Sequence, residues 1–279
     1  MNKFGPILSL TLTVAIALAV SAPAQESPYV RFRAHNAEMK QVQPTWMGPV
    51  SHSDPRLGQG LKLSVSQSDF PPVHPTIYGN NKGISVVVQR RFQLDFDPPS
   101  YFRNHSSAQK DGLGNAATQV KYRIASGNAS HGNFALTAIL FHGFGARANQ
   151  NQLLSAYYVP SIAAGKAFGR FATVSTVGGF VPTAKIAAQG RAVEWNFTAQ
   201  AHATEHLWLD IENNAAFFHA GPFDGKTQNL VTPAAIYVLR RKQWKPEHAA
   251  VALVCGEQIA TSGFHTYNHN VITEMRITF

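Results

Sequence analysis

The histidines His265 and His269 stand four residues apart near the end of the chain, and histidine is a common metal ligand. On a helix this spacing would place both imidazoles on one face, where they could share an ion. In an extended strand, which rises about 3.3 Å per residue, the two side chains would lie roughly 13 Å apart. A turn could still bring them together, but the flanking residues predict a polar loop leading into a strand. We therefore expect neither a metal site nor another cofactor.

Candidate nucleophiles and bases are also present, as a surface hydrolase would require. His105 and Ser106 are adjacent, His142 follows further along, and His202 shares a segment with Glu194. Nucleophilic catalysis needs a nucleophile, a base and an orienting group within hydrogen-bond reach. No spacing singles out such a set, so we expect no enzymatic activity and keep a surface hydrolase as an alternative.

Polar and apolar residues alternate along many segments, which is the pattern of extended strands, and no helical period follows the N-terminal residues. In residues 192–203, Trp195 and Phe197 share one face, while Glu194, Asn196 and Gln200 share the other. Similar alternation occurs at 116–126, 206–217 and 268–279. A soluble β-sandwich with its apolar face inward would alternate in the same way as a membrane barrel with its apolar face outward.

The connections between the predicted strands favour the membrane barrel. From residue 116 onwards they alternate between shorter and longer, as expected for short periplasmic turns and longer outside loops. The shorter set comprises 127–133, 166–168, 204–205 and 241–247, and the longer set comprises 143–153, 181–191, 218–228 and 259–267.

The last strand favours the barrel as well. It ends on Phe279 and has Met275 and Ile277 at alternate positions before it. A terminal strand of this form resembles the signal that the barrel-assembly machinery of Gram-negative bacteria recognises, so we expect these three residues to direct assembly. Aromatic residues also gather near the predicted strand ends, as in the aromatic girdles of barrels.

The N-terminus has the features of a cleaved secretory signal. Lys3 is followed by an apolar run at residues 7–20 and then by the small-residue motif Ala22-Pro23-Ala24. The run is too short for a spanning helix, so we expect export and cleavage after Ala24. The sequence has one cysteine, Cys255, so no internal disulfide can form, and a closed barrel would be stabilised by its hydrogen-bond ladder instead.

The chain is basic, with a net charge of +9 and a pI near 9.8. Its 24 Lys and Arg residues are scattered, and the export signal argues against a nucleic-acid partner. Basic loops that face anionic lipid headgroups or lipopolysaccharide account for the charge better.

The strand count depends on residues 84–96, which form either one long strand or a hairpin that turns near 89–91. Bacterial single-chain barrels have even strand numbers, so the hairpin, which gives twelve strands, is favoured over eleven. Ten stays open if residues 56–67 lie outside the barrel. We therefore expect a signal peptide at 1–24, a leader segment at 25–55 in the periplasm or the lumen, and an all-β, antiparallel, up-and-down barrel at 56–279.

In such a barrel the polar faces of the strands would line the lumen. The residues expected there are Lys121, Arg123, Glu194, Asn196, Gln200, His202, Asp210, Glu212, Asn214, Glu274 and Arg276. Isolated charges in a confined interior are costly, so we expect the carboxylates to pair with the lysine and arginines across the lumen. An acid–base pair among these carboxylates is the catalytic alternative.

Several short motifs carry a resemblance to a known family. They are Tyr78-Gly79-Asn80-Asn81-Lys82-Gly83, Lys121 to Ser126 followed by His131-Gly132-Asn133, Asp224 to Gln228, Thr232-Pro233, and His265 to Asn270. The region from Trp46 to Phe279 resembles the MetA-pathway of phenol degradation family, a group of bacterial outer-membrane barrels described as transporters. The resemblance implies uptake of small, often aromatic compounds, and it supplies no catalytic residues.

Taken together, these features predict an outer-membrane channel or transporter through which small solutes pass by passive diffusion, aromatic or hydrophobic compounds among them. A barrel of twelve strands is narrow, because barrel diameter grows with strand number. Mixed charge in its lumen would disfavour large ions. The alternative is a closed barrel that acts through its loops, as a structural or adhesion protein or as the surface hydrolase considered above.

Overall fold

The computed structural model describes residues 27–279 except 81, 108, 146–154 and 240–249. The expected signal peptide and the expected turn at 241–247 therefore lie outside the described residues. The chain divides into two units, Met1–Ala37 and Glu38–Phe279. The border falls within helix α2 (Pro28–Gln41), and every described strand belongs to the second unit.

Helix α2 corrects the expectation that no helix follows the signal peptide. Its charged residues include Arg31, Arg33, Glu38 and Lys40, and no apolar stripe runs along one side. A helix that is polar all round gives no periodic hydrophobic signal, which is why the sequence pattern did not indicate it. None of the helices in the described ranges is long and apolar enough to cross a membrane.

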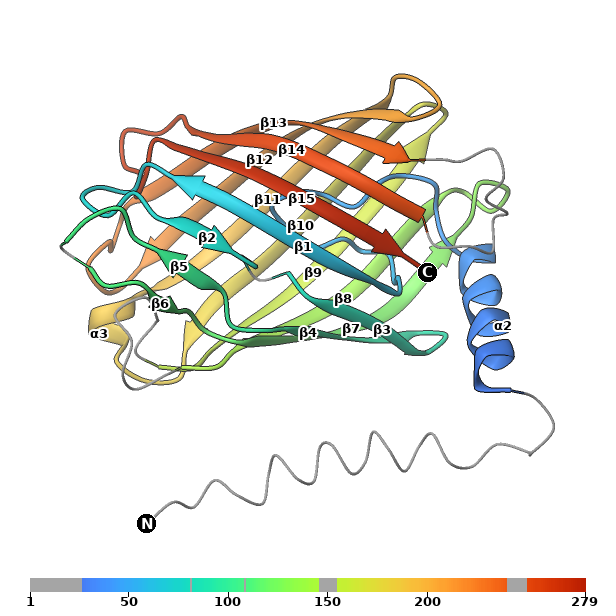
Figure 1. Ribbon diagram of the computed structural model, residues 1–279, viewed down its shortest axis with the longest axis horizontal. Helices are drawn as coiled ribbons and strands as arrows, with labels where there is room; N and C mark the ends of the chain where they lie inside the picture. Colours follow the sequence, from blue (N-terminus) through green and yellow to red (C-terminus); the bar gives the residue numbers. More distant parts are fainter. Residues whose placement is uncertain (1–26, 81, 108, 146–154, 240–249) are drawn as a thin grey trace, which may run out of the picture. The chain divides into compact units, whose positions relative to one another are not determined.

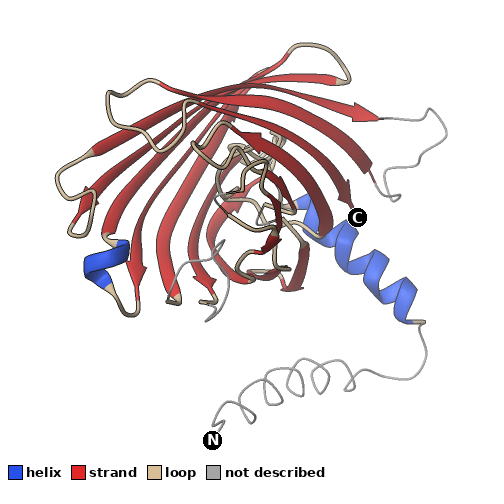
Figure 2. Ribbon diagram, turned by 60° about the vertical axis from the view of Figure 1, so that its left-hand side comes forward, coloured by secondary structure: helices blue, strands red, loops and turns tan. Residues whose placement is uncertain are grey.

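The second unit is a closed, antiparallel barrel of twelve strands, which confirms the predicted fold class and strand number (Figure 1 and Figure 2). The pairing of β1 with β15, from Gly60↔Thr278 to Ser68↔Asn270, closes the ring. In order around the ring the strands are β1 (Gly60–Ser68), β3 (Ile84–Gln89), β4 (Phe92–Asp97), β7 (Ala117–Gly127), β8 (Phe134–Gly143), β9 (Tyr157–Phe168), β10 (Phe171–Pro182), β11 (Arg191–His202), β12 (Leu207–His219), β13 (Thr227–Leu239), β14 (Ala250–Ala260) and β15 (His269–Thr278).

The first strands contain both a confirmed detail and a missed one. Strands β3 and β4 form the predicted hairpin, which turns at residues 90–91. Strand β1 begins at Gly60 instead of the predicted residue 56, because the chain before it bends away from the wall. Three short strands were not expected: β2 (Thr76–Tyr78), β5 (Tyr101–Arg103) and β6 (Gly112–Leu113) extend the sheet from the second half of β1.

The barrel has two different ends. At the proximal end, where β1 begins and β15 ends, the described connections are short and span residues 90–91, 128–133, 169–170 and 203–206. At the distal end the connections are mostly longer, and one of them contains the short helix α3 (Ile186–Gln189). The turn predicted at 166–168 is wrong, since these residues continue β9 in register with β10.

The two faces of the wall differ in polarity. Outward side chains are largely apolar and exposed: Trp195 is 45% exposed, and Ile211 and Leu253 are similar. Inward positions carry mainly polar or small residues, such as Thr198 and Glu212, which are buried. An apolar outer belt around a polar interior is typical of a membrane-spanning barrel and the reverse of a soluble β-sandwich.

Candidate functional site in the barrel lumen

The predicted lumen residues all occupy inward positions of their strands. Seven are buried, namely Lys121, Arg123, Gln200, Asp210, Glu212, Glu274 and Arg276. Four are partly exposed, namely Glu194, Asn196, His202 and Asn214. Their different burial has one main cause, a segment of the chain that fills part of the lumen.

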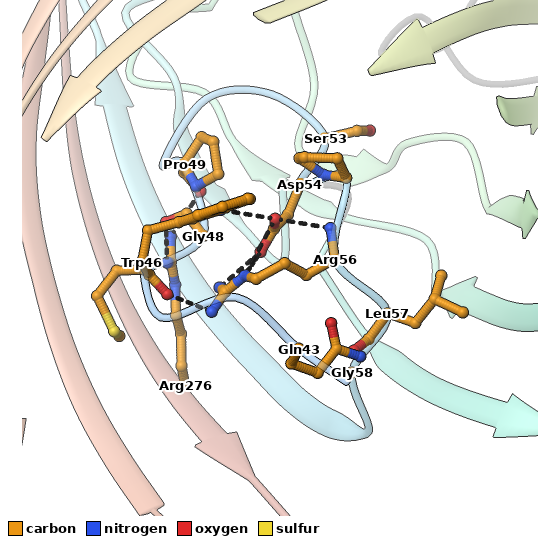
Figure 3. A network of polar contacts seen from close by, with 12 residues as sticks. Gln43, Trp46, Gly48, Pro49, Ser53, Asp54, Arg56, Leu57, Gly58 and Arg276 are labelled. Carbon is orange, nitrogen blue, oxygen red and sulfur yellow. Dashed lines mark hydrogen bonds and ion pairs between the residues drawn. The ribbon is translucent and has the colours of Figure 1, made fainter. Parts of the chain in front are cut away.

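This segment, residues 43–58, links α2 to β1, and we call it the plug. Its partners are inward side chains of β4, β7, β8, β11, β12 and β15, on several sides of the ring. Of the two places expected for this part of the chain, the periplasm and the lumen, it therefore occupies the lumen. Near its two ends, the Gln43 side-chain amide donates a hydrogen bond to the Leu57 carbonyl (Figure 3).

The apex of the plug binds Glu212 of β12. Its carboxylate accepts hydrogen bonds from the backbone N–H groups of Val50 and Ser51, the latter at 2.9 Å, and from the Ser51 hydroxyl. The Ser51 hydroxyl also lies 2.8 Å from Oδ1 of Asn214. A carboxylate buried without partners would be strongly unfavourable, whereas bonds from N–H groups to an ionised acceptor are among the stronger hydrogen bonds. Glu212 is thus satisfied by the plug.

Arg276 of β15 holds the preceding turn of the plug. Its guanidinium donates to the carbonyls of Gly48 and Pro49, the latter at 2.8 Å (Figure 3). It also donates to Glu274 at 2.9 Å. One arginine therefore fixes two consecutive plug carbonyls while its own charge is balanced on the same strand.

The side chain of Trp46 packs against mainly small residues of the barrel wall. It is 1% exposed and belongs to a buried cluster that includes Ala135, Ala172 and Val174. A β-carbon added at Gly165 would lie 2.7 Å from the indole, so this position must be glycine if Trp46 is to pack as it does. Strands β8, β9 and β10 thus leave room for one large aromatic side chain.

An ion pair within the plug stabilises Trp46 from the other side. Asp54 and Arg56 are 2.6 Å apart, the indole N–H donates to Asp54 at 3.3 Å, and Arg56 lies over the Trp46 ring (Figure 3). Burial acts to raise the pKa of Asp54, but Arg56 and Lys121 outweigh it and hold this pKa well below its ordinary value. The carboxylate is therefore ionised in the lumen.

The returning half of the plug crosses to the opposite wall. Nζ of Lys121 donates to the Asp54 carbonyl at 3.1 Å, and the Ser53 hydroxyl donates to Gln119 at 2.7 Å. The backbone N–H of Gly58 donates to Gln93 at 2.7 Å. These bonds to β4 and β7 lie across the ring from those made to β12, which shows that the plug spans the lumen.

His52 lies at the apex between two threonines. Its Nε2 is 2.5 Å from Oγ1 of Thr198, and its Nδ1 is 3.3 Å from Oγ1 of Thr176. Burial lowers the pKa of His52, and the negative charge of Glu212 opposes this only in part. The imidazole is therefore neutral at pH 7. Sequence reasoning missed His52 as well as Trp46, because the plug has no regular period from which their partners could be inferred.

The predicted charge pairing across the lumen is mostly wrong. Glu274 does pair with Arg276, but the two are neighbours on one strand. Glu212 binds the plug, and Asp210 accepts from Gln200 at 3.2 Å. The side chain of Glu194 has no hydrogen bond or ion pair within the described residues. The plug supplies partners that the wall alone was expected to provide.

The candidate catalytic and metal-binding side chains are not brought together. Nδ1 of His269 lies 2.8 Å from Glu257, and Nδ1 of His265 lies 3.0 Å from the Ser262 carbonyl. His105, His142 and His202 contact Thr76, Tyr158 and Trp208 respectively, in separate parts of the barrel.

The proposed assembly residues lie at the end of the chain. Met275 and Ile277 take outward positions of β15, and Phe279 directly follows this strand, where its N–H donates to the Gln59 carbonyl at 3.0 Å. Cys255 is exposed on the outer face. A role of the three terminal residues in assembly stays a prediction.

Comparison with solved structures finds the same architecture in an outer-membrane protein. The chain superposes on the COG4313 outer membrane channel from Pseudomonas putida F1 with a TM-score of 0.53 and 11% sequence identity. The match covers 84% of this chain and 100% of that one, so the whole channel fold is represented. No family model matches the chain, and no curated protein matches it by sequence. The comparison establishes the fold, and membership of the MetA-pathway family stays a prediction.

Proposed function

We propose that this chain is an outer-membrane channel for small solutes whose path is opened and closed by the plug. Three features support this proposal: the apolar outer belt, the polar interior, and the shared fold with an outer membrane channel. The chain would be exported by its signal peptide, inserted by the barrel-assembly machinery and surrounded by outer-membrane lipid and lipopolysaccharide. The resemblance of several motifs to the MetA-pathway family favours small aromatic or hydrophobic compounds as solutes.

The observation that carries the proposal is how the plug is held. Its apolar contacts are mainly those of Trp46, Val50, Met47 and Leu57, and the rest of the plug is held by hydrogen bonds, such as those to Glu212, Arg276 and Lys121. Such bonds contribute only about 0.5–1.5 kcal/mol each, or up to about 3 when one partner is charged, because water can replace them. Because water can replace most of these contacts, the plug can leave the lumen as water enters, at the cost of exposing its few apolar side chains.

The decisive experiment is conductance in planar bilayers. Glu212→Ala removes the acceptor of the plug apex, and Glu257→Ala is a matched control, because Glu257 is an exposed carboxylate outside the lumen. We expect Glu212→Ala to give larger or more frequent openings than the unchanged protein and the control. Silence in all three, with barrels that remain folded, would contradict the channel.

A second candidate function is a closed barrel that acts through its distal loops. One observation favours it: Phe223 and Phe264, from two different loops, pack against Phe218 with ring centroids 5.0–5.8 Å apart. Ordered loops of this kind can present a surface for binding. This candidate predicts silent bilayers together with binding that is lost when the aromatic loop residues are replaced.

A further inference from the structure

The distal half of the lumen contains a second group of inward residues, which we call the vestibule: Asp97, Phe141, Tyr157, Phe180 and Glu194. They come from five different strands, β4, β8, β9, β10 and β11, and each lies toward the distal end of its strand. No part of the plug is bonded to them among the described residues. All except Asp97 are partly exposed, so solvent reaches these side chains inside the barrel.

Three of the vestibule residues form an aromatic cluster. The ring centroids of Phe141 and Tyr157 are 5.9 Å apart, and those of Tyr157 and Phe180 are 5.0 Å apart. A β-carbon added at Gly143 would lie 2.1 Å from the Tyr157 ring, so this glycine is what allows the ring to take its position. The cluster presents aromatic surface to the lumen in addition to filling space.

Glu194 adds an unpaired carboxyl group beside this cluster. Its neighbours across the two adjoining strands are Gly178 and Ala216, whose side chains are too small to cover it. Phe180 is two residues from Gly178 along β10, which makes it a diagonal neighbour within reach of Glu194. The carboxyl group of Glu194 has no hydrogen bond or ion pair in the described part of the chain.

Asp97 faces the same space from β4. It is 8% exposed, and its side chain likewise has no hydrogen bond or ion pair within the described residues. Strands β8, β9 and β10, which carry the aromatic cluster, lie between β4 and β11 in the ring, so Asp97 and Glu194 stand on either side of it. Lys62 and Lys82 act on the charge of Asp97, whereas no lysine or arginine of the described residues forms an ion pair with Glu194.

We propose that the vestibule binds an organic ammonium cation, with Glu194 as its counter-ion and the rings of Tyr157 and Phe180 against its methyl or methylene groups. Cations are attracted to aromatic faces, and aromatic cages beside a carboxylate recognise quaternary ammonium groups. An unpaired carboxylate in a confined lumen is unfavourable by itself, and a bound cation would relieve that cost. The proposal rests on the proposed function, since it names a class of solute for the same lumen.

The vestibule is placed so that a solute bound there would lie on the distal side of the closed plug. The next lumen-facing residue of β11 after Glu194, toward the proximal end, is Asn196. It accepts a hydrogen bond from Asn214 at 2.8 Å. Asn214 in turn is bonded to Ser51 at the plug apex. A cation bound at Glu194 would therefore lie next to Asn196 along β11, and Asn196 is connected through Asn214 to the apex of the closed plug.

The test is equilibrium binding of choline to the full-length protein in a maltoside detergent, measured by calorimetry. The comparison ligand is the neutral carbon isostere of choline, in which a tert-butyl group replaces the trimethylammonium group. We expect choline to bind about tenfold more tightly than the isostere, since only choline carries the charge that Glu194 attracts. Equal affinities, or displacement of choline by potassium at equal concentration, would overturn the proposal.

Variants assign the binding to the vestibule. Glu194→Gln should weaken choline binding about tenfold by removing the counter-ion, and Glu194→Asp should restore part of it. Tyr157→Leu should weaken it about threefold through loss of the aromatic face. Glu257→Gln, an exposed carboxylate elsewhere, should bind as the unchanged protein does. Unchanged affinity in Glu194→Gln would refute the assignment.

Binding in detergent is independent of passage across a membrane. A protein that conducts but does not bind choline would therefore refute the ammonium site and leave the channel intact. A protein that binds choline through Glu194 but stays silent in bilayers would support the site and refute the channel.

Discussion

The proximal and distal halves of the lumen are lined by the same alternating strands, yet their polar side chains are used differently. In the proximal half, Glu212 and Arg276 are bonded to the plug. In the distal half, Glu194 is unpaired and the aromatic residues beside it are partly exposed. The difference indicates that the proximal half is built to be closed by the chain itself, and the distal half to exchange its contents with solvent.

The largest loss of stability should come from replacing Trp46. Trp46→Ala removes a fully buried aromatic side chain from the proximal half, and such changes cost about 3–5 kcal/mol. We expect the plug to leave the lumen and bilayer conductance to rise. Phe180→Ala is the distal control, because Phe180 is partly exposed, and should cost well under half as much. Equal losses of thermal stability in both variants would show that the two halves are packed alike.

The next effect compares the outer and inner faces of one strand. Phe197→Arg places a charge on the apolar belt, where it should cost about 2–4 kcal/mol near the middle of a membrane. Asn196→Arg places the same charge in the partly exposed distal lumen and should cost far less. Unfolding of lipid-reconstituted protein by denaturant measures both. Equal costs would mean that the two faces are wrongly assigned or that the distal lumen is closed to solvent.

A smaller effect concerns pH and His52. Burial lowers the pKa of His52 in the docked plug, whereas the same histidine in a released plug would have a pKa near 6.5. As the pH falls, His52 is therefore protonated more readily in the released plug than in the docked plug. The docked state is most stable above pH 6.5 and becomes less stable as the pH falls below it. Glu212 and Asp54 oppose this weakening and Lys82 adds to it.

We accordingly expect open probability to increase when the pH is lowered from 8 to 5, and His52→Gln to remove most of that dependence. His265→Gln, in a distal loop, serves as the control and should keep it. A pH profile that is the same in His52→Gln and in the unchanged protein would assign the titration to another group.

The sequence was sufficient for the wall of the barrel and insufficient for its contents. A two-residue period identifies a strand and both of its faces, so the inward position of Glu194 and the outward position of Trp195 follow from local pattern alone. The even strand number of bacterial barrels then indicated the hairpin within residues 84–96. Local pattern could also identify Glu212 as polar and inward.

The local sequence pattern could not identify what Glu212 binds. Val50 and Ser51 are more than 160 residues away in the chain, and the plug has no period that aligns it with the wall. The expectation that inner carboxylates pair with inner cations treated the lumen as empty. Helix α2 was missed for a related reason, since a helix without an apolar stripe leaves no periodic signal.

The central claim, that movement of the plug opens the lumen, can be tested by locking the plug. Oγ of Ser51 donates a hydrogen bond to Oδ1 of Asn214 at 2.8 Å, so Ser51→Cys and Asn214→Cys place two thiols on facing sides of the contact between plug and wall, where a disulfide would fix the plug. Cys255→Ser removes the native thiol and by itself serves as the control. We predict little conductance from the oxidised protein, a clear increase after reduction, and no redox effect in the control. Equal conductance in the oxidised and reduced states, with the disulfide verified by mass, would contradict a path that depends on plug movement.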